Sequence, residues 1–182
     1  DIKRTQPRGP TKAQITELLR KFSAHVESAA AEPGLFWVSA KGMRRLYGRP
    51  QAWCEALHQA LTAQGWQSTV VAGFGHFPTQ VVARAARRTI VFADPAQERE
   101  AAARVPLSRC GLGVDELEAL TQLGLKRLGD LLRLPAEGLH QRFGQRLYRL
   151  HRLTTGALQD PLQPQAERLA VRDWIFHEFP ES

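Results

Sequence analysis

Two glycines in the second half of the chain are spaced so that the backbone around them can bind a phosphate group. Segment 105–125 reads VPLSRCGLGVDELEALTQLGL, with Gly111-Leu112-Gly113 between two apolar segments of helical spacing. Glycine lets the backbone turn tightly, and the amides of the turn and of the next helix start then point outward at a phosphate. Such a contact is indifferent to base sequence. The segment predicts a helix-hairpin-helix motif in which Gly111, Leu112, Gly113 and Val114 contact DNA phosphates.

Acidic side chains at the start of the following helix bear on this contact. Asp115, Glu116 and Glu118 stabilise the helix dipole, but they repel a phosphate that approaches the same amides. The sequence therefore leaves two readings of the hairpin open. It either binds a phosphate or only packs against its neighbours.

Arginines near the hairpin could follow a phosphate backbone. Arg142, Arg146, Arg149 and Arg152 lie at positions i, i+4, i+7 and i+10, so the last three share one helical face. A solvated basic face is the alternative. We predict DNA contacts for Arg142, Arg146 and Arg149, and for Arg84 from a smaller basic cluster upstream.

Catalytic carboxylates are missing where a strand and a tight turn could carry them. Segment 35–48 reads LFWVSAKGMRRLYG, an apolar strand pattern followed by a turn, and no acid lies between Glu32 and Glu55. Ser39 has no His or Asp placed near it by the sequence. The Gly-Phe-Gly turn at 73–75 lacks the lysine and hydroxyl of a phosphate-binding P-loop. We therefore expect no catalytic residue and no cofactor.

The overall composition is that of a basic globular chain. It has 182 residues, 43% of them hydrophobic, and a formal net charge of +7. The basic excess favours a polyanionic partner, nucleic acid first, over a solvated surface without a partner. No apolar run approaches the roughly 18 residues of a membrane helix, and no signal peptide is visible. We expect a cytoplasmic, nucleoid-associated protein.

Metal binding through cysteine or histidine is not expected. Cys54 and Cys110 make neither a disulfide framework nor a zinc site, and the six histidines show no metal-like spacing. Because both cysteines sit among apolar neighbours, they are predicted to be buried thiols in a reducing compartment.

The first half of the chain alternates helix and strand patterns. We predict helices over 12–26, 50–64, 78–88 and 96–104, and strands over 35–38, 68–72 and 89–93. This order predicts an α/β unit in which helices cover a small sheet.

The second half contains only helix patterns joined by glycine and proline turns. Short helices are predicted over 114–123, 127–134, 136–143 and 145–155. They are separated by Gly124, Pro135 and Gly144, which indicates a compact helical subdomain.

These helices, read as one segment, resemble a known family. GLGVDELEALTQLGLKRLGDLLRLPAEGLHQRFG resembles the thumb of Y-family translesion DNA polymerases, and the upstream elements look like the second half of their palm. FWVSAKGMRRLYG is similar to a pattern of the ImuB-like branch. The resemblance covers about 13–165. It implies an α+β fold, with a palm-like β-sheet covered by helices and then a small all-helical thumb with a helix-hairpin-helix.

The same resemblance implies a division into domains. The expected parts are a linker or tail at 1–12, a partial palm-like domain at 13–104, a thumb-like domain at 105–163, and a linker with the start of a little-finger domain at 164–182.

The departures from the family concern its catalytic residues. Aligning Gly42 with the family's strand glycine puts Gly34 and Leu35 where active members carry an Asp-Glu pair. The family's Asn-Lys pair, whose lysine meets the incoming triphosphate, corresponds to Thr79-Gln80. Two Mg²⁺ ions require carboxylates, so the resemblance implies a protein without polymerase activity. The first metal-binding aspartate and the fingers would lie before Asp1.

The function implied is that of a non-catalytic, DNA-binding scaffold in SOS-induced translesion synthesis and mutagenesis. By resemblance its partners would be DNA, a RecA-like ImuA protein, a DnaE-type error-prone polymerase and the sliding clamp. Two alternatives stay open: a fragment of an active error-prone Y-family polymerase, and a generic helix-hairpin-helix DNA-binding module.

Overall fold

The computed structural model describes residues 10–30, 32–155 and 157–158. The expected linker at 1–12 lies mostly outside the described residues, and the expected start of a little-finger domain lies wholly outside them. The fold is mixed α+β, mostly helical with small sheets. In chain order the elements are α1 (Lys12–Arg20), β1 (Val26–Ser28), β2 (Phe36–Val38), α2 (Met43–Tyr47), α3 (Pro50–Ala63), β3 (Val71–Ala72), α4 (His76–Ala85), β4 (Ile90–Val91), α5 (Pro95–Ala103), the 3₁₀ turn η1 (Leu107–Arg109), α6 (Val114–Gln122), α7 (Leu128–Leu132) and α8 (Ala136–Thr155).

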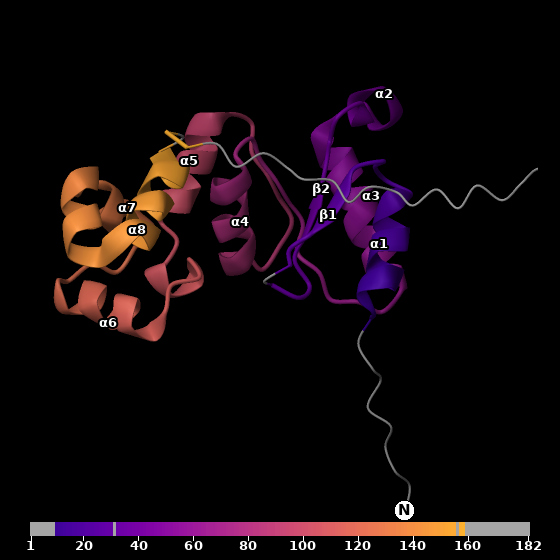
Figure 1. Cartoon of the computed structure of the whole chain (residues 1–182). Coiled ribbons are helices and arrows are strands. Elements are labelled where there is room, and N and C mark those ends of the chain that lie inside the picture. Colours follow the sequence, from indigo (N-terminus) through magenta and orange to yellow (C-terminus); the bar gives the residue numbers. More distant parts are fainter. Residues whose placement is uncertain (1–9, 31, 156, 159–182) are drawn as a thin grey trace, which may run out of the picture.

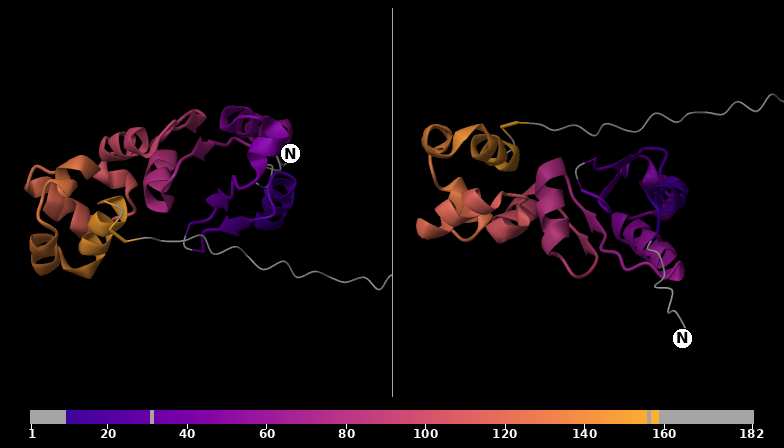
Figure 2. Two further views of the ribbon diagram at one scale, coloured as in Figure 1. Left: turned by 90° about the horizontal axis from the view of Figure 1, so that it is seen from above. Right: turned by 60° about the horizontal axis from the view of Figure 1, so that its bottom comes forward.

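Two lobes can be followed in Figures 1 and 2. We call α1, β1, β2, α2 and α3 the N-terminal lobe, and α4 to α8 the C-terminal lobe. Each lobe has its own hydrophobic core. Helices α4 and α5 share their core with the predicted thumb helices, so hydrophobic packing does not follow the expected boundary at 104/105. That boundary stays a prediction.

The prediction of one small sheet was wrong for the described residues. Strands β1 and β2 form an antiparallel pair, in which Val26 lies opposite Val38. Strands β3 and β4 form a separate parallel pair, in which Val71 lies opposite Ile90. The strand at Phe36–Val38 therefore pairs with its neighbour in the chain, as a hairpin, and not with the strands that follow it.

The end of the first helix also differs from the prediction. Thr11 caps α1 as expected, its hydroxyl accepting the Gln14 N–H at 3.3 Å, but the helix ends at Arg20 and not at 26. The Ser23 hydroxyl accepts the N–H of His25 at 3.2 Å and donates to the Ser39 carbonyl at 2.8 Å. A serine that bonds local backbone competes with helix formation. Strand β1 begins three residues later.

The short parallel pair lies between the two cores. Val71 and Ile90 pack against the core of the C-terminal lobe, whereas Ala72 and Val91 pack against that of the N-terminal lobe. This is the two-residue alternation of a strand covered on both faces. The strands thus join the lobes through apolar contacts on either side.

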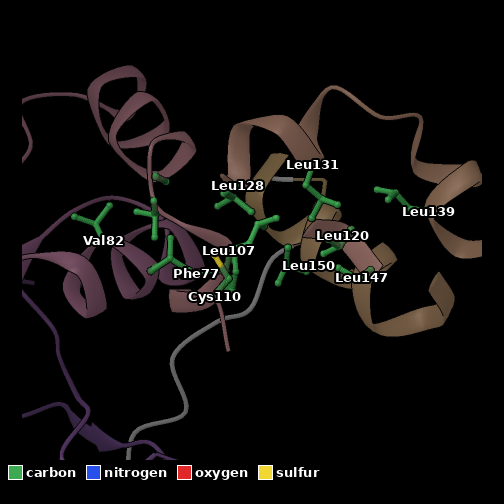
Figure 3. Packing of buried hydrophobic residues seen from close by; sticks show 13 residues of the cluster. Phe77, Val82, Leu107, Cys110, Leu120, Leu128, Leu131, Leu139, Leu147 and Leu150 are labelled. Carbon is green, nitrogen blue, oxygen red and sulfur yellow. The ribbon is translucent and has the colours of Figure 1, made fainter. Parts of the chain in front are cut away.

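The larger core fills the centre of the C-terminal lobe (Figure 3). Its fully buried leucines come from η1, α6, α7 and both parts of α8, and they are Leu107, Leu120, Leu128, Leu131, Leu139 and Leu147. Gly144 has φ 79° and interrupts α8, so the two helices predicted on either side of it are the two arms of α8. No helix among the described residues combines the length and the apolar character of a membrane span.

A buried carboxylate closes the Gly-Phe-Gly turn between β3 and α4. Glu98 of α5 is 2% exposed and accepts the backbone N–H groups of Phe74 and Gly75 at 3.0–3.1 Å. The hydroxyl of Thr79 also donates to it. A Cβ at Gly73 would overlap the side chains of Glu98 and Thr79. The two amides of this turn are therefore already occupied by a carboxylate of the same chain.

Both cysteines are buried, as predicted. Cys54 lies in the N-terminal core and Cys110 in the C-terminal core, and they are 0% and 4% exposed. Burial raises the pKa of each thiol to about 11, so both are protonated near neutral pH. They act as small apolar side chains of the two cores.

Candidate nucleic-acid interface

The glycine hairpin connects a single 3₁₀ turn to an α-helix. Gly111 has φ +75°, a conformation that favours glycine, and Gly113 is the N-cap of α6. The element before the hairpin is the three-residue η1, shorter than the helix that the motif predicts. Val114, the first residue of α6, is 72% exposed. The hairpin tip and the start of α6 are therefore open to a ligand.

Leu112 and Gly113 have different roles in this hairpin. The Leu112 side chain packs against the C-terminal core, so only its backbone is left for a phosphate. The Gly113 N–H donates to the Glu116 carboxylate at 2.8 Å. A helix start leaves its first N–H groups without intrahelical acceptors, and those of Val114 and Asp115 are the next along the chain. Within the predicted set, the backbone N–H of Val114 is therefore better placed for an anion than that of Gly113.

Arg146 joins the second arm of α8 to the hairpin. Its guanidinium donates to the Gly111 carbonyl and lies 3.3 Å from the Glu116 carboxylate. Glu116, which the sequence suggested would repel a phosphate, is thus paired with a cation. The Arg146 side chain is still 60% exposed, and a guanidinium has five N–H donors. The structure thus brings Gly111, Gly113 and Arg146 together, and their contact with DNA stays a prediction.

The other three arginines of the predicted stripe differ in position. Arg149 is exposed on the same arm of α8 as Arg146, one helical turn further along. Arg142 is also exposed, but it precedes the break at Gly144 and lies on the first arm. Arg152 contacts the Tyr148 ring and donates to the Ala157 carbonyl. A continuous basic face on one helix thus contains Arg146 and Arg149 but not Arg142.

Arg84 links three parts of the molecule. Its Nε donates to both carboxylate oxygens of Glu32 at 3.0–3.1 Å, and its Nη1 donates to the Arg109 carbonyl at 3.5 Å. A Cβ at Gly111 would lie 3.1 Å from the same nitrogen. The side chain is only 21% exposed. Arg84 therefore lies beside the hairpin, but Glu32 already neutralises its charge, and its contact with DNA stays a prediction.

The residues expected at the catalytic positions lie around the β1–β2 turn and the start of α4. Gly34, with φ +91°, and Leu35 belong to the turn. The nearby acid is Glu32, which Arg84 binds and which the Gln80 amide approaches at 3.5 Å. The ring of Trp37 stacks on that of His76, with 3.8 Å between centroids. Among the described residues, no group of three or more His, Cys, Asp or Glu could hold a metal ion.

The sequence did not predict that Glu32 and Glu116 form ion pairs in this region. Each carboxylate pairs with an arginine that is far away in the chain, and no local pattern indicates such a partner. For Glu116 a local signal existed, because an acid at the third position of a helix bonds the N-cap amide.

Replacing Glu32 with glutamine should lower the free energy of unfolding by about 0.5–1 kcal/mol at pH 7, because the Arg84 ion pair is partly exposed. The hydrogen bond from Arg84 lowers the pKa of Glu32. The stability that the ion pair contributes is present above the unfolded-state pKa of Glu32, near 4.5. It is lost as the pH falls through the lowered pKa of the folded state. Urea unfolding at several pH values should show the two proteins converging in acid.

Glu17→Gln on the exposed side of α1 is the matched control and should change stability little at any pH. A difference between wild type and Glu32→Gln that grows in acid would contradict the assignment of the ion pair.

Comparison with known proteins gives a match of fold. No protein-family model matches the sequence, and no curated protein is similar to it. Among solved structures 16 chains match, and one is the DinB protein from Sulfolobus solfataricus, with a TM-score of 0.61 and 15% sequence identity. The match covers 84% of this chain and 46% of that chain. The chain is thus similar in fold to part of that DinB chain, and the match spans less than half of its length.

Proposed function

We propose that this chain is a DNA-binding, non-catalytic relative of Y-family polymerases that acts in translesion DNA synthesis. The observation that carries the proposal is the glycine hairpin with Arg146 against it, on a fold similar to that of DinB. The likeness of fold to DinB supports a role in DNA repair. The scaffold role and the ImuB-like assignment are the finer parts of the proposal.

DNA binding is supported by two arginines next to the hairpin. Arg146 offsets Glu116, and Arg149 adds a second exposed cation one turn away. The start of α6 presents backbone amides and a helix dipole to an anion. Such a surface contacts phosphates and not base edges, so the chain should bind duplex DNA of any sequence.

The absence of catalysis is supported by the side chains around Gly34. A polymerase needs carboxylates for two Mg²⁺ ions and a cation for the triphosphate. Here the family's acidic positions carry Gly34 and Leu35, and Gln80 replaces the lysine. The neighbouring Glu32 is engaged by Arg84. The partners proposed by family resemblance are a RecA-like ImuA protein, a DnaE-type polymerase and the sliding clamp.

A two-stage assay on primed duplex DNA tests the proposal. The first stage measures binding by fluorescence anisotropy between about 50 and 200 mM salt, where three phosphate contacts give a log–log slope near −2.7. A flat response would favour a hairpin that only packs against protein. The second stage adds Mg²⁺ and the four dNTPs to the whole natural protein. No extension of the primer is expected, and clear incorporation would support the active-polymerase alternative.

A further inference from the structure

A pocket lies at the end of α3, on a different set of elements from the hairpin. It is an open depression with a volume of about 530 Å³. Its walls come from the last turns of α3, segment 65–69 and Arg87. These segments precede β3 and β4, so the pocket is at the edge where both parallel strands begin. None of the lining residues is acidic.

An aromatic ring forms one wall of this pocket and is held firmly. Gly65 ends α3 with φ +75°, and its N–H donates to the Thr62 carbonyl at 2.8 Å. The Trp66 N–H reaches back to the Leu61 carbonyl at 3.2 Å. This is the bonding of a glycine helix C-cap, which fixes the direction of the chain after the helix. Trp66 also packs against the N-terminal core, so its position does not depend on a ligand.

Polar groups surround the same space. Arg87 is exposed and is the only arginine or lysine among the lining residues. Within the described part of the chain it has no ion pair or hydrogen bond. The Ser68 hydroxyl lies 3.2 Å from Nδ1 of His58, and the Thr69 side chain lines the pocket beside it. The pocket thus combines a flat apolar ring, one uncommitted cation and hydroxyl and imidazole groups.

We propose that this pocket binds one nucleoside phosphate unit, with the base stacked on Trp66 and the phosphate at Arg87. Stacking on an aromatic side chain suits any base, and an arginine beside it supplies a charge-assisted hydrogen bond to a phosphate oxygen. The hydroxyls of Ser68 and Thr69 are placed for the sugar or the phosphate. The unit can come from a free nucleotide or from single-stranded DNA, because both present the same chemistry.

The test uses dAMP and the ¹⁵N-labelled chain. Two-dimensional NMR resolves the tryptophan indole N–H signals, and Trp66→Phe assigns the one that belongs to Trp66. On titration with dAMP this signal should shift and saturate in the range of about 1 mM. Arg87→Gln should weaken the apparent dAMP affinity about fivefold to tenfold. The matched control is Arg88→Gln, which removes the same charge one residue away and does not line the pocket.

Further ligands distinguish the outcomes. Inorganic phosphate alone should not reproduce the shift, and deoxyadenosine should bind more weakly than dAMP. A (dA)₁₀ strand that binds more tightly than dAMP, with the same loss in Arg87→Gln, identifies single-stranded DNA as the source, whereas equal or weaker binding identifies the free nucleotide. The proposal is overturned by no shift at about 10 mM dAMP, by an equal shift with phosphate, or by equal weakening in Arg87→Gln and Arg88→Gln. Duplex binding at the hairpin is measured in a separate assay. The proposed function and the nucleotide pocket can therefore be disproved independently of each other.

Discussion

Replacing Glu98 with alanine should lower the free energy of unfolding by about 3 kcal/mol. The carboxylate is 2% exposed and accepts hydrogen bonds from Phe74 N–H, Gly75 N–H and the Thr79 hydroxyl. Its removal leaves donors inside the protein without acceptors and opens a void between α4 and α5. Because the turn before α4 is built around this side chain, the loss extends to the contact between β3 and α4.

Urea unfolding followed by circular dichroism at pH 7 measures the effect. Glu98→Gln should also be destabilised, since its amide group would place N–H donors against donors already present. The matched control is Glu100→Ala on the same helix, where the side chain is 65% exposed and pairs with Arg104. That change should stay within about 0.5 kcal/mol. Equal losses in the free energy of unfolding for Glu98→Ala and Glu100→Ala would show that the buried hydrogen bonds of Glu98 do not stabilise the fold.

Most helices were predictable because their signals are local, although α2 was not predicted. In α3, the spacing predicts a buried face made of Trp53, Ala56, Leu57, Ala60 and Leu61. The three large side chains are buried, and the two alanines are half-buried. Pro50 at the start and Gly65 after the end mark its limits correctly. The sheets were not predictable to the same degree. Strands of two or three residues carry too few side chains to specify a partner, and pairing depends on segments that are distant in the chain.

The candidate site divides in the same way. The glycine spacing around Gly111 predicts the turn, because a positive φ is a property of single residues. The ion pairs of Arg84 with Glu32 and of Arg146 with Glu116 depend on the packing of α4 and α8 against the rest of the chain. No spacing rule brings those residues together. The sequence therefore predicted a basic surface but not which of its cations are already neutralised.

The two exposed arginines next to the hairpin, Arg146 and Arg149, lead to the largest effect expected on DNA binding. The double substitution Arg146→Gln/Arg149→Gln should weaken binding to primed duplex DNA about tenfold to thirtyfold near 0.1 M salt. It should also make the log–log salt slope less steep by about 1–2, because fewer phosphate contacts mean that fewer counterions are released on binding. Fluorescence anisotropy over a range of salt concentrations measures both quantities.

The control for this prediction removes the same charge elsewhere. Arg45→Gln/Arg49→Gln changes exposed arginines on and after α2, which lies in the other lobe (Figure 1). If net charge alone attracted DNA, the two double variants would lose affinity equally, and the hairpin would not be the interface.

The single variants separate the two roles of the arginines. Arg149→Gln removes one cation, so it should lose only a part of the affinity. Arg146→Gln removes a cation and also leaves Glu116 unpaired next to the Gly113 amide, which adds repulsion at the point where the phosphate approaches. It should therefore account for more than half of the loss, and Glu116→Gln added to it should restore part of the binding. Restoration would place the phosphate at the hairpin, and no restoration would place it further along α8.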